Sequence, residues 1–214
     1  MTPKKNQRND TPDATSATNL IEVASRVSND ARMRKNRHKG GVLWFTGLPG
    51  SGKSTLAMEL EYTLFEAGYA VFVLDGDNMR RGLNTDLGFL PDDRTENIRR
   101  VGEVAALMAN AGLITIAAFI SPYQSDRDRA RKAAEDCFHE IAVKADLKTC
   151  ERRDPKGHYK QARAGEIRDF TGISAPYEEP EHPELSIDTA NNNIDQCVAQ
   201  LMNYVTGKFA LNKN

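Results

Sequence analysis

From residue 41 onward, short apolar runs alternate with stretches of helix-forming composition. The runs are apolar at successive positions rather than at every second one, which is typical of strands that are buried on both faces of a sheet. They read GVLWFT (41–46), AVFVLD (70–75), LITIAAFI (113–120), FHEIAVK (138–144) and the weaker LSIDT (185–189). Helices are predicted between and after them, at 53–67, 94–111, 125–136 and 193–205. This alternation predicts an α/β domain with a parallel five-stranded sheet and helices on both faces.

Residues 1–38 lack this pattern. They are polar, rich in Thr, Asn, Lys and Arg, and have no sustained apolar period. We expect a flexible N-terminal arm with one short helix over about 21–32. Residues 39–214 are expected to form a single domain, because no internal repeat or further linker interrupts them.

Composition and charge exclude several classes of protein. The chain has a formal net charge of −1, with acidic and basic residues interleaved, which favours neither nucleic acid nor an anionic membrane as a partner. No apolar run approaches the ~18 residues of a membrane span, and the N terminus has no apolar core for a secretory signal. Cys137, Cys150 and Cys197 show no CxxC spacing, as expected of free thiols in a reducing compartment. We therefore expect a cytoplasmic protein.

The segment GLPGSGKST, from Gly47 to Thr55, matches the Walker A spacing between a predicted strand and a predicted helix. Glycines in such a loop let backbone N–H groups turn toward phosphate oxygens at a helix N terminus. Lys53 brings a positive charge to the β and γ phosphates, and the Ser54 hydroxyl is a ligand for Mg²⁺. The motif predicts a binding site for ATP or GTP.

Two carboxylates follow the second apolar run. Asp75 and Asp77 flank Gly76, whereas the central run 113–120 is followed by Ser121 and no carboxylate. The carboxyl ends of parallel strands share one edge, so the acidic pair is expected beside the phosphate loop. Alternate positions of an extended chain would point both side chains into one site, one toward Mg²⁺ and one toward an attacking hydroxyl. This arrangement suits a small-molecule kinase, and the alternative is an ordinary solvated Asp-Gly-Asp turn.

The helix predicted from residue 94 begins near the same edge. Arg94 lies one turn before Ile98, on the core-facing side, and is expected to point over the sheet edge, where a cation suits an anionic ligand. Asn97 is its neighbour at i+3. The alternative for Arg94 is an ion pair with Asp92 or Asp93.

Residues 150–173, CERRDPKGHYKQARAGEIRDFTGI, are basic and are interrupted by Pro and Gly. Such a segment is either a mobile lid that closes over a nucleotide or a solvated charged surface. Phe89 and Phe170 stand in polar, glycine-containing surroundings, so they either stack on a base or fill the core.

Together these motifs resemble those of the adenylylsulfate kinase family. The matching motifs occur in the same order as in the family and extend over all of the chain except the arm. They are FTGLPGSGKST, LDGDNMRRGLN, DLGF, ENIRRVGEVAALMANAGLI, AFISPY, RDPKG, KQARAGEIRDFTGI and PYEEPEHPEL. A phosphate loop alone would fit shikimate or gluconate kinases equally well, whereas the combination of DGDNMR, ENIRRVGEVA and FISPY distinguishes this family from them.

The resemblance implies a P-loop kinase fold with a mobile lid at about 150–173. It implies that the γ-phosphoryl group of ATP passes in line to the 3′-hydroxyl of adenylylsulfate, giving ADP and 3′-phosphoadenylylsulfate in sulfate assimilation. It also implies Mg²⁺ as cofactor and a homodimer, with ATP and adenylylsulfate as small-molecule partners. The alternatives are a small-molecule kinase with a nucleoside or sugar-acid acceptor, or a non-catalytic nucleotide-binding module.

The resemblance further implies roles for individual residues. The catalytic set is Lys53, Asp75, Asp77 and Ser121, with Asp77 favoured as the base and phosphorylation of Ser121 treated as incidental. The ATP-binding set is Gly47, Leu48, Pro49, Gly50, Ser51, Gly52, Lys53, Ser54, Thr55 and Arg153. The adenylylsulfate-binding set is Asp77, Arg80, Phe89, Arg94, Asn97, Ile120, Ser121, Lys156 and Phe170. Phe89 and Phe170 would stack on the adenine, and the metal ligands would be Ser54 and Asp75.

Two positions depart from the family pattern. Pro49 stands where the family's loop usually has Ser, and Gln124 stands where the family often has Arg. If that arginine contributes charge to the site, the affinity for substrate is expected to be lower in this chain.

Overall fold

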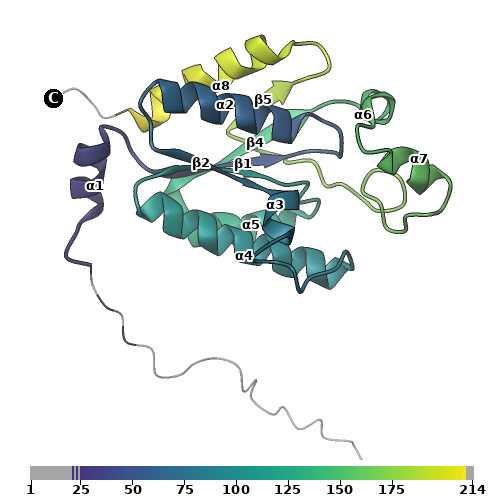
Figure 1. Ribbon diagram of the computed structural model, residues 1–214, viewed down its shortest axis with the longest axis horizontal. Coiled ribbons are helices and arrows are strands. Elements are labelled where there is room, and N and C mark those ends of the chain that lie inside the picture. The colour runs from purple at the N-terminus through teal and green to yellow at the C-terminus, as the bar shows by residue number, and fades with distance from the viewer. Residues whose placement is uncertain (1–20, 22, 24, 211–214) are drawn as a thin grey trace, which may run out of the picture.

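A parallel sheet forms the centre of the molecule in the computed structural model, which describes residues 21, 23 and 25–210 (Figure 1). Its strand order is β2-β3-β1-β4-β5, and every neighbouring pair is parallel. The strands are β1 (Gly41–Thr46), β2 (Val71–Asp75), β3 (Ile114–Ala118), β4 (Phe138–Lys144) and β5 (Leu185–Asp188). The predicted five-stranded parallel sheet is confirmed, with each strand inside its predicted range.

Helices cover both faces of the sheet, as predicted. On one face lie α2 (Lys53–Glu66) and α8 (Ile194–Phe209), and on the other lie α4 (Pro91–Asn110) and α5 (Gln124–Ala134) (Figure 1). The shorter elements are α1 (Asn29–Asn36), α3 (Gly76–Arg80), the 3₁₀ turn η1 (Glu135–Cys137), α6 (Leu147–Arg153) and α7 (His158–Arg163).

The central strand β1 explains why its sequence is apolar without interruption. All of its residues are buried. Leu43 and Phe45 join the core cluster beneath α2 and α8, whereas Val42 and Trp44 join the cluster beneath α4 and α5. A strand with helices packed on both faces has no side exposed to water, so its alternation of polar and apolar residues disappears.

Several helix ends differ from the prediction for physical reasons. Helix α4 begins at Pro91 rather than at 94, because proline is well suited to the first helical position. Leu90 precedes it without a side-chain cap. Helix α8 continues past residue 205 to Phe209, whose side chain is buried in the core cluster beneath α2 and α8.

The helix predicted at about 21–32 lies instead at Asn29–Asn36, where Ser28 caps its N terminus. Asn36, the last residue of α1, donates to the Gly112 carbonyl (2.8 Å), and just after the helix the His38 ring accepts a hydrogen bond from the Ala70 backbone N–H (2.9 Å). Residues just before the predicted boundary at 38 are thus attached to the domain. The boundary itself stays a prediction, and most of the predicted arm lies outside the described residues.

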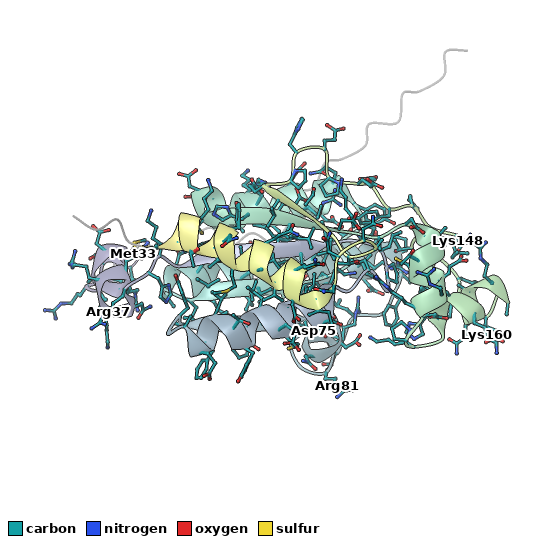
Figure 2. All side chains as sticks on the ribbon, turned by 90° about the horizontal axis from the view of Figure 1, so that it is seen from above. Met33, Arg37, Asp75, Arg81, Lys148 and Lys160 are labelled. Carbon is teal, nitrogen blue, oxygen red and sulfur yellow. The ribbon has the colours of Figure 1, made fainter. Side chains whose placement is uncertain are left out.

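Helix α1 and the α6–α7 region lie at opposite ends of the sheet. Figure 2 shows Met33 and Arg37 at one end of the molecule and Lys148 and Lys160 at the other. Within the part of the chain that the structure describes, no helix has the length and apolar character that crossing a bilayer requires.

Candidate active site

The carboxyl ends of the central strands meet at one edge of the sheet, as predicted. Phe45 of β1 and Asp75 of β2 both pair in register with Ala118 of β3. The phosphate loop after β1, the acidic segment after β2 and the turn after β3 are therefore level with one another. Helices α6 and α7 lie beyond this end of the sheet (Figure 1).

The phosphate loop is held closely against β4 and α6. A Cβ atom at Gly47 would lie 2.4 Å from the Val143 carbonyl oxygen, and one at Gly50 would lie 3.0 Å from the Cys150 carbonyl oxygen. Gly50 also has a φ of +74°, which favours glycine. Close backbone approach thus requires both glycines. Gly47 is the first residue of the Walker A pattern, so at that position the pattern has a packing cause as well as a chemical one.

Lys53 is the first residue of α2, and its side chain contacts the phosphate loop. Its ammonium donates hydrogen bonds to the carbonyl oxygens of Gly47 (2.9 Å) and Leu48 (2.8 Å), and the residue is only 8% exposed. Burial lowers the pKa of Lys53 to about 8, against the opposing attraction of Asp75. The buried Lys53 ammonium is thus well placed to exchange these two carbonyl acceptors for phosphate oxygens.

Ser54 and Asp75 are in direct contact. The Ser54 hydroxyl donates to Asp75 Oδ2 (2.7 Å), and Asp75 Oδ1 accepts from the Asp77 backbone N–H (3.1 Å). Asp75 is thereby the N-cap of the short helix α3. The extended geometry expected for Asp75 and Asp77 is wrong, because α3 begins at Gly76 and Asp77 lies in its first turn.

Asp77 is joined to the basic segment 150–173, which we call the lid segment after its predicted role. Its carboxylate forms an ion pair with Lys156, which lies between α6 and α7, and both side chains are more than half exposed. An exposed pair of this kind contributes little to stability. It nevertheless places the lid segment beside the acidic turn. A solvated charged surface, the alternative interpretation of residues 150–173, would have no such partner there.

The lid segment also contacts the phosphate loop. Arg153 donates to the Gly50 carbonyl (3.4 Å) and to both Thr189 oxygens, and the Tyr159 hydroxyl donates to the Pro49 carbonyl (2.9 Å). These bonds bring Arg153 next to the predicted ATP-binding loop.

Phe89 and Phe170 have different surroundings. Phe170 is 8% exposed and packs with Cys150, Tyr159 and Ala162 in a small apolar cluster of the lid segment. Phe89 is 69% exposed, and the Arg80 guanidinium lies 4.4 Å from its ring centroid. Of the two interpretations left open, core filling describes Phe170 and does not describe Phe89. Stacking on a base stays a prediction for both.

Arg94 connects the two loops that carry these phenylalanines. It donates to the Phe89 carbonyl (2.8 Å), the Asp169 carbonyl (2.6 Å) and the Thr171 hydroxyl (3.2 Å). Among the described residues it forms no ion pair with a carboxylate, so the alternative of a bond to Asp92 or Asp93 is wrong.

Ile120 and Ser121 follow β3 at the same edge. The Ile120 carbonyl accepts from the Thr46 hydroxyl (2.8 Å). Ser121 is buried with a φ of +40°, and its hydroxyl accepts from the Trp44 indole N–H (3.1 Å). The Ser121 hydroxyl is thus enclosed, and its predicted place in the catalytic set remains a prediction.

Sequence reasoning missed polar residues that assemble this edge. An open hollow beside Leu48 is lined by residues 172–177 and 179. Thr46 joins one wall to β1 through a hydrogen bond with the Tyr177 hydroxyl (3.1 Å). Asn84 is fully buried and donates to Asn97 Oδ1 (3.0 Å). A threonine at a strand end or an asparagine in a loop carries no distinctive signal in a single sequence.

No group of three or more His, Cys, Asp or Glu side chains suited to a metal ion occurs in residues 21, 23 and 25–210. An all-protein metal cage is therefore not built from these side chains. The Ser54–Asp75 pair offers oxygen ligands of the kind that Mg²⁺ takes together with phosphates and water.

Comparison with known proteins gives consistent matches. A family model described as "Adenylylsulphate kinase" matches residues 39–188. The adenylyl-sulfate kinase of Oceanobacillus iheyensis is 56% identical over 193 residues, which cover 90% of this chain and 97% of that protein. The adenylyl-sulfate kinase of Staphylococcus carnosus is 56% identical over 188 residues, covering 87% of this chain and 94% of that protein.

Solved structures agree with these matches. The Mycobacterium tuberculosis APS kinase in complex with AMPPNP and APS superposes with a TM-score of 0.74 at 47% identity, covering 77% of this chain and 96% of that one. A gluconokinase from Sinorhizobium meliloti, at 15% identity and a TM-score of 0.52, has a similar fold and covers 80% of this chain and 97% of its own.

The packing of the loop predicts that Gly47→Ala is not tolerated. Its Cβ would meet a carbonyl oxygen of β4, so we expect the substitution to lower the melting temperature by several degrees, as a loss of about 2 kcal/mol would. Gly207→Ala is the control, because Gly207 lies in α8 with open space around it and should be neutral or slightly stabilising. Equal melting temperatures for Gly47→Ala and the wild type would contradict the packing argument.

Proposed function

The chain belongs to the adenylylsulfate kinase family, and from that premise we propose which of its residues bind the substrates and which transfer the phosphoryl group. Adenylylsulfate kinases transfer the γ-phosphoryl group of ATP to adenylylsulfate, giving ADP and 3′-phosphoadenylylsulfate. This chain catalyses the same reaction. The observation that carries the residue assignment is the placement of the phosphate loop, the Ser54–Asp75 contact and Asp77 at one edge of the sheet.

ATP binds with its phosphates on residues 47–55. Backbone N–H groups of the loop and the N terminus of α2 point at the phosphate oxygens. Lys53 exchanges the Gly47 and Leu48 carbonyls for the β and γ phosphates, and Arg153, already bonded to the Gly50 carbonyl, faces the nucleotide from α6. This exchange costs little, because one set of oxygen acceptors replaces another.

Ser54 and Asp75 hold Mg²⁺. Their oxygens are 2.7 Å apart, and a hydroxyl and a carboxylate are ligands of the hard type that this ion prefers. When bound, Mg²⁺ neutralises charge on the phosphate oxygens. Asp75 keeps its orientation through its other oxygen, which caps α3.

Asp77 is the general base. The 3′-oxygen of adenylylsulfate forms a bond to the γ-phosphorus, the bond from that phosphorus to the β–γ bridging oxygen breaks, and Asp77 accepts the hydroxyl proton. Lys156 must leave Asp77 for this step, and the anionic substrate offers it a new partner. The lid segment is therefore mobile in this proposal.

The acceptor is held by cations and an aromatic side chain. Arg80 and Arg94 suit an anionic ligand, and the exposed ring of Phe89 stacks on the adenine with the face that Arg80 does not cover. Asn97 contacts the same ligand from α4, and Ile120 and Ser121 border it at the end of β3. Because Phe170 is buried in the apolar cluster of the lid segment, it contacts the adenine only after that cluster separates.

A homodimer and a cytoplasmic location belong to the same proposal. Helix α2 exposes Met58, Tyr62 and Phe65 at helical spacing, and Phe72 is exposed on the neighbouring edge strand β2, which supports a contact between two copies. The free thiols of the described cysteines suit a reducing compartment.

The substrate assignment predicts selective ADP release. ADP should form with ATP, Mg²⁺ and adenylylsulfate, and not above background with adenosine 5′-monophosphate, gluconate or shikimate as acceptor. A coupled assay of ADP measures all four acceptors under one condition. Turnover with gluconate or shikimate and none with adenylylsulfate would contradict the assignment.

The role of Asp77 predicts a loss of turnover without a loss of ATP binding. Asp77→Asn should lower kcat between about a hundred- and ten-thousandfold, because it removes the base and leaves the phosphate loop intact. Asp92→Asn, an exposed carboxylate in the first turn of α4, is the control and should keep wild-type kcat. A kcat for Asp77→Asn within threefold of wild type would exclude Asp77 as the base.

The pKa of Lys53 predicts how ATP affinity depends on pH. Burial lowers that pKa to about 8 in the free protein, so the ammonium loses its proton as pH rises through this value and the charge that attracts the phosphates disappears. Calorimetric Kd values for Mg-ATP should therefore be constant below about pH 7 and rise above pH 8. In Lys53→Arg, whose guanidinium stays charged, binding is weaker overall but its rise with pH should vanish. An affinity that is flat from pH 7 to pH 9.5 in the wild type would contradict the assignment.

A further inference from the structure

Asn84 is a buried amide that satisfies only part of its hydrogen-bonding capacity. It lies between α3 and α4, is 0% exposed, and donates from Nδ2 to Asn97 Oδ1 over 3.0 Å. Its own Oδ1 is buried and accepts no hydrogen bond from any described residue. Leaving a buried carbonyl oxygen without a donor costs stability, so the residue is expected to have a compensating role.

The backbone of Asn84 is held in place independently of its side chain. Its N–H donates to the Met79 carbonyl of α3 (3.0 Å), and its carbonyl accepts from the Leu87 N–H (3.2 Å). The amide is therefore presented to α4 from a fixed loop. The same loop carries Phe89 and the two carbonyls, of Leu87 and Gly88, that bind Arg80.

The contact selects one orientation of the Asn97 amide. A side-chain amide has a donor end and an acceptor end of nearly the same shape, so packing alone does not distinguish them. With Oδ1 engaged by Asn84, the Nδ2 group of Asn97, a residue that is 4% exposed, donates to no described residue and is left to bond a ligand. The reverse arrangement would bury the NH₂ group of Asn84 without an acceptor, which is rarer in proteins than a buried carbonyl without a donor.

This orientation suits the charge of the acceptor. Asn97 lies one turn after Arg94 on α4, and adenylylsulfate is anionic. An N–H donor adds to the attraction exerted by Arg80 and Arg94, whereas an amide oxygen turned toward the same ligand would repel it.

We propose that Asn84 is a positioning residue for the acceptor, which acts by holding Asn97 with its Nδ2 group toward adenylylsulfate. The inference rests on the proposed function, in which Asn97 contacts that substrate. Asn84 itself does not touch the substrate, because its side chain is fully enclosed between the loop and α4. The site is thus oriented before the ligand arrives.

The test is steady-state kinetics on three single variants and one double variant, each checked for folding by its melting temperature. Asn84→Leu removes the donor while keeping the branching of the side chain, and it should raise KM for adenylylsulfate at least about tenfold, the loss expected for a hydrogen bond to a charged group. KM for ATP should stay within about twofold of wild type, because the phosphate loop is untouched. Asp86→Asn is the matched control, since it breaks the exposed Asp86–Arg100 ion pair of the same loop and should leave both KM values unchanged.

Asn97→Ala separates the inference from the function on which it rests. This variant alone should raise KM for adenylylsulfate, and adding Asn84→Leu to it should change that KM by less than about twofold, because both substitutions remove one interaction. If Asn97→Ala leaves KM unchanged, the proposed contact and the role of Asn84 both fail. If Asn97→Ala raises KM and Asn84→Leu alone does not, or if the two effects multiply, only the role of Asn84 is overturned.

A further variant keeps the test decisive if Asn84→Leu does not fold. In Asn84→Asp the introduced carboxyl is buried and holds its proton to a higher pH than an exposed one. While protonated it donates to Asn97 Oδ1 as the amide does, and when ionised it can only accept. The ratio of its KM for adenylylsulfate to that of the wild type should therefore be near one at low pH and rise with pH. A ratio that does not change with pH would overturn the proposal.

Discussion

The parallel pairing of β1 between β3 and β4 is the constraint on which the rest of the structure depends. Because neighbouring strands run in the same direction, the segments that follow β1, β2 and β3 all leave the sheet at one edge. The phosphate loop, Asp75 and Ser121 are brought together by this geometry alone. Helices pack on both faces of the buried strand β1. This packing fixes the positions of α2, which carries Lys53, and α4, which carries Arg94, relative to that edge.

The cations of the site are held by oxygen atoms of the protein itself. Lys53 is bonded to loop carbonyls, Arg94 to the carbonyls of Phe89 and Asp169, and Lys156 to the Asp77 carboxylate. Each of these contacts is of the kind that a phosphate or sulfate oxygen replaces. Lys53 and Arg94 are already in position and need little reorganisation during the reaction, which is how protein electrostatics lower a barrier. Lys156 must first leave Asp77.

The parts of the fold that could be predicted are those with a local cause. Uninterrupted apolar runs predicted the buried strands, and glycine spacing before a helix predicted the phosphate loop. The features that could not be predicted depend on a local cap or on contacts between residues far apart in the sequence. Asp77 was expected on an extended chain, but the Asp75 side chain caps a short helix there. Phe170 is buried by Cys150 and Tyr159, residues that come next to it only after the lid segment folds. Asn84 stands in a loop sequence that is typical of turns, so its contact with Asn97 has no signature along the chain.

The edge of the sheet directs the γ-phosphoryl group to a single oxygen of adenylylsulfate. The most direct measurement is ³¹P and ¹H NMR of the product formed from ATP and adenylylsulfate. We expect one new phosphomonoester signal, coupled to the ribose proton at C3′, with the sulfate linkage intact. A phosphoryl group on the 2′-oxygen, or inorganic phosphate in place of an ester, would contradict the account.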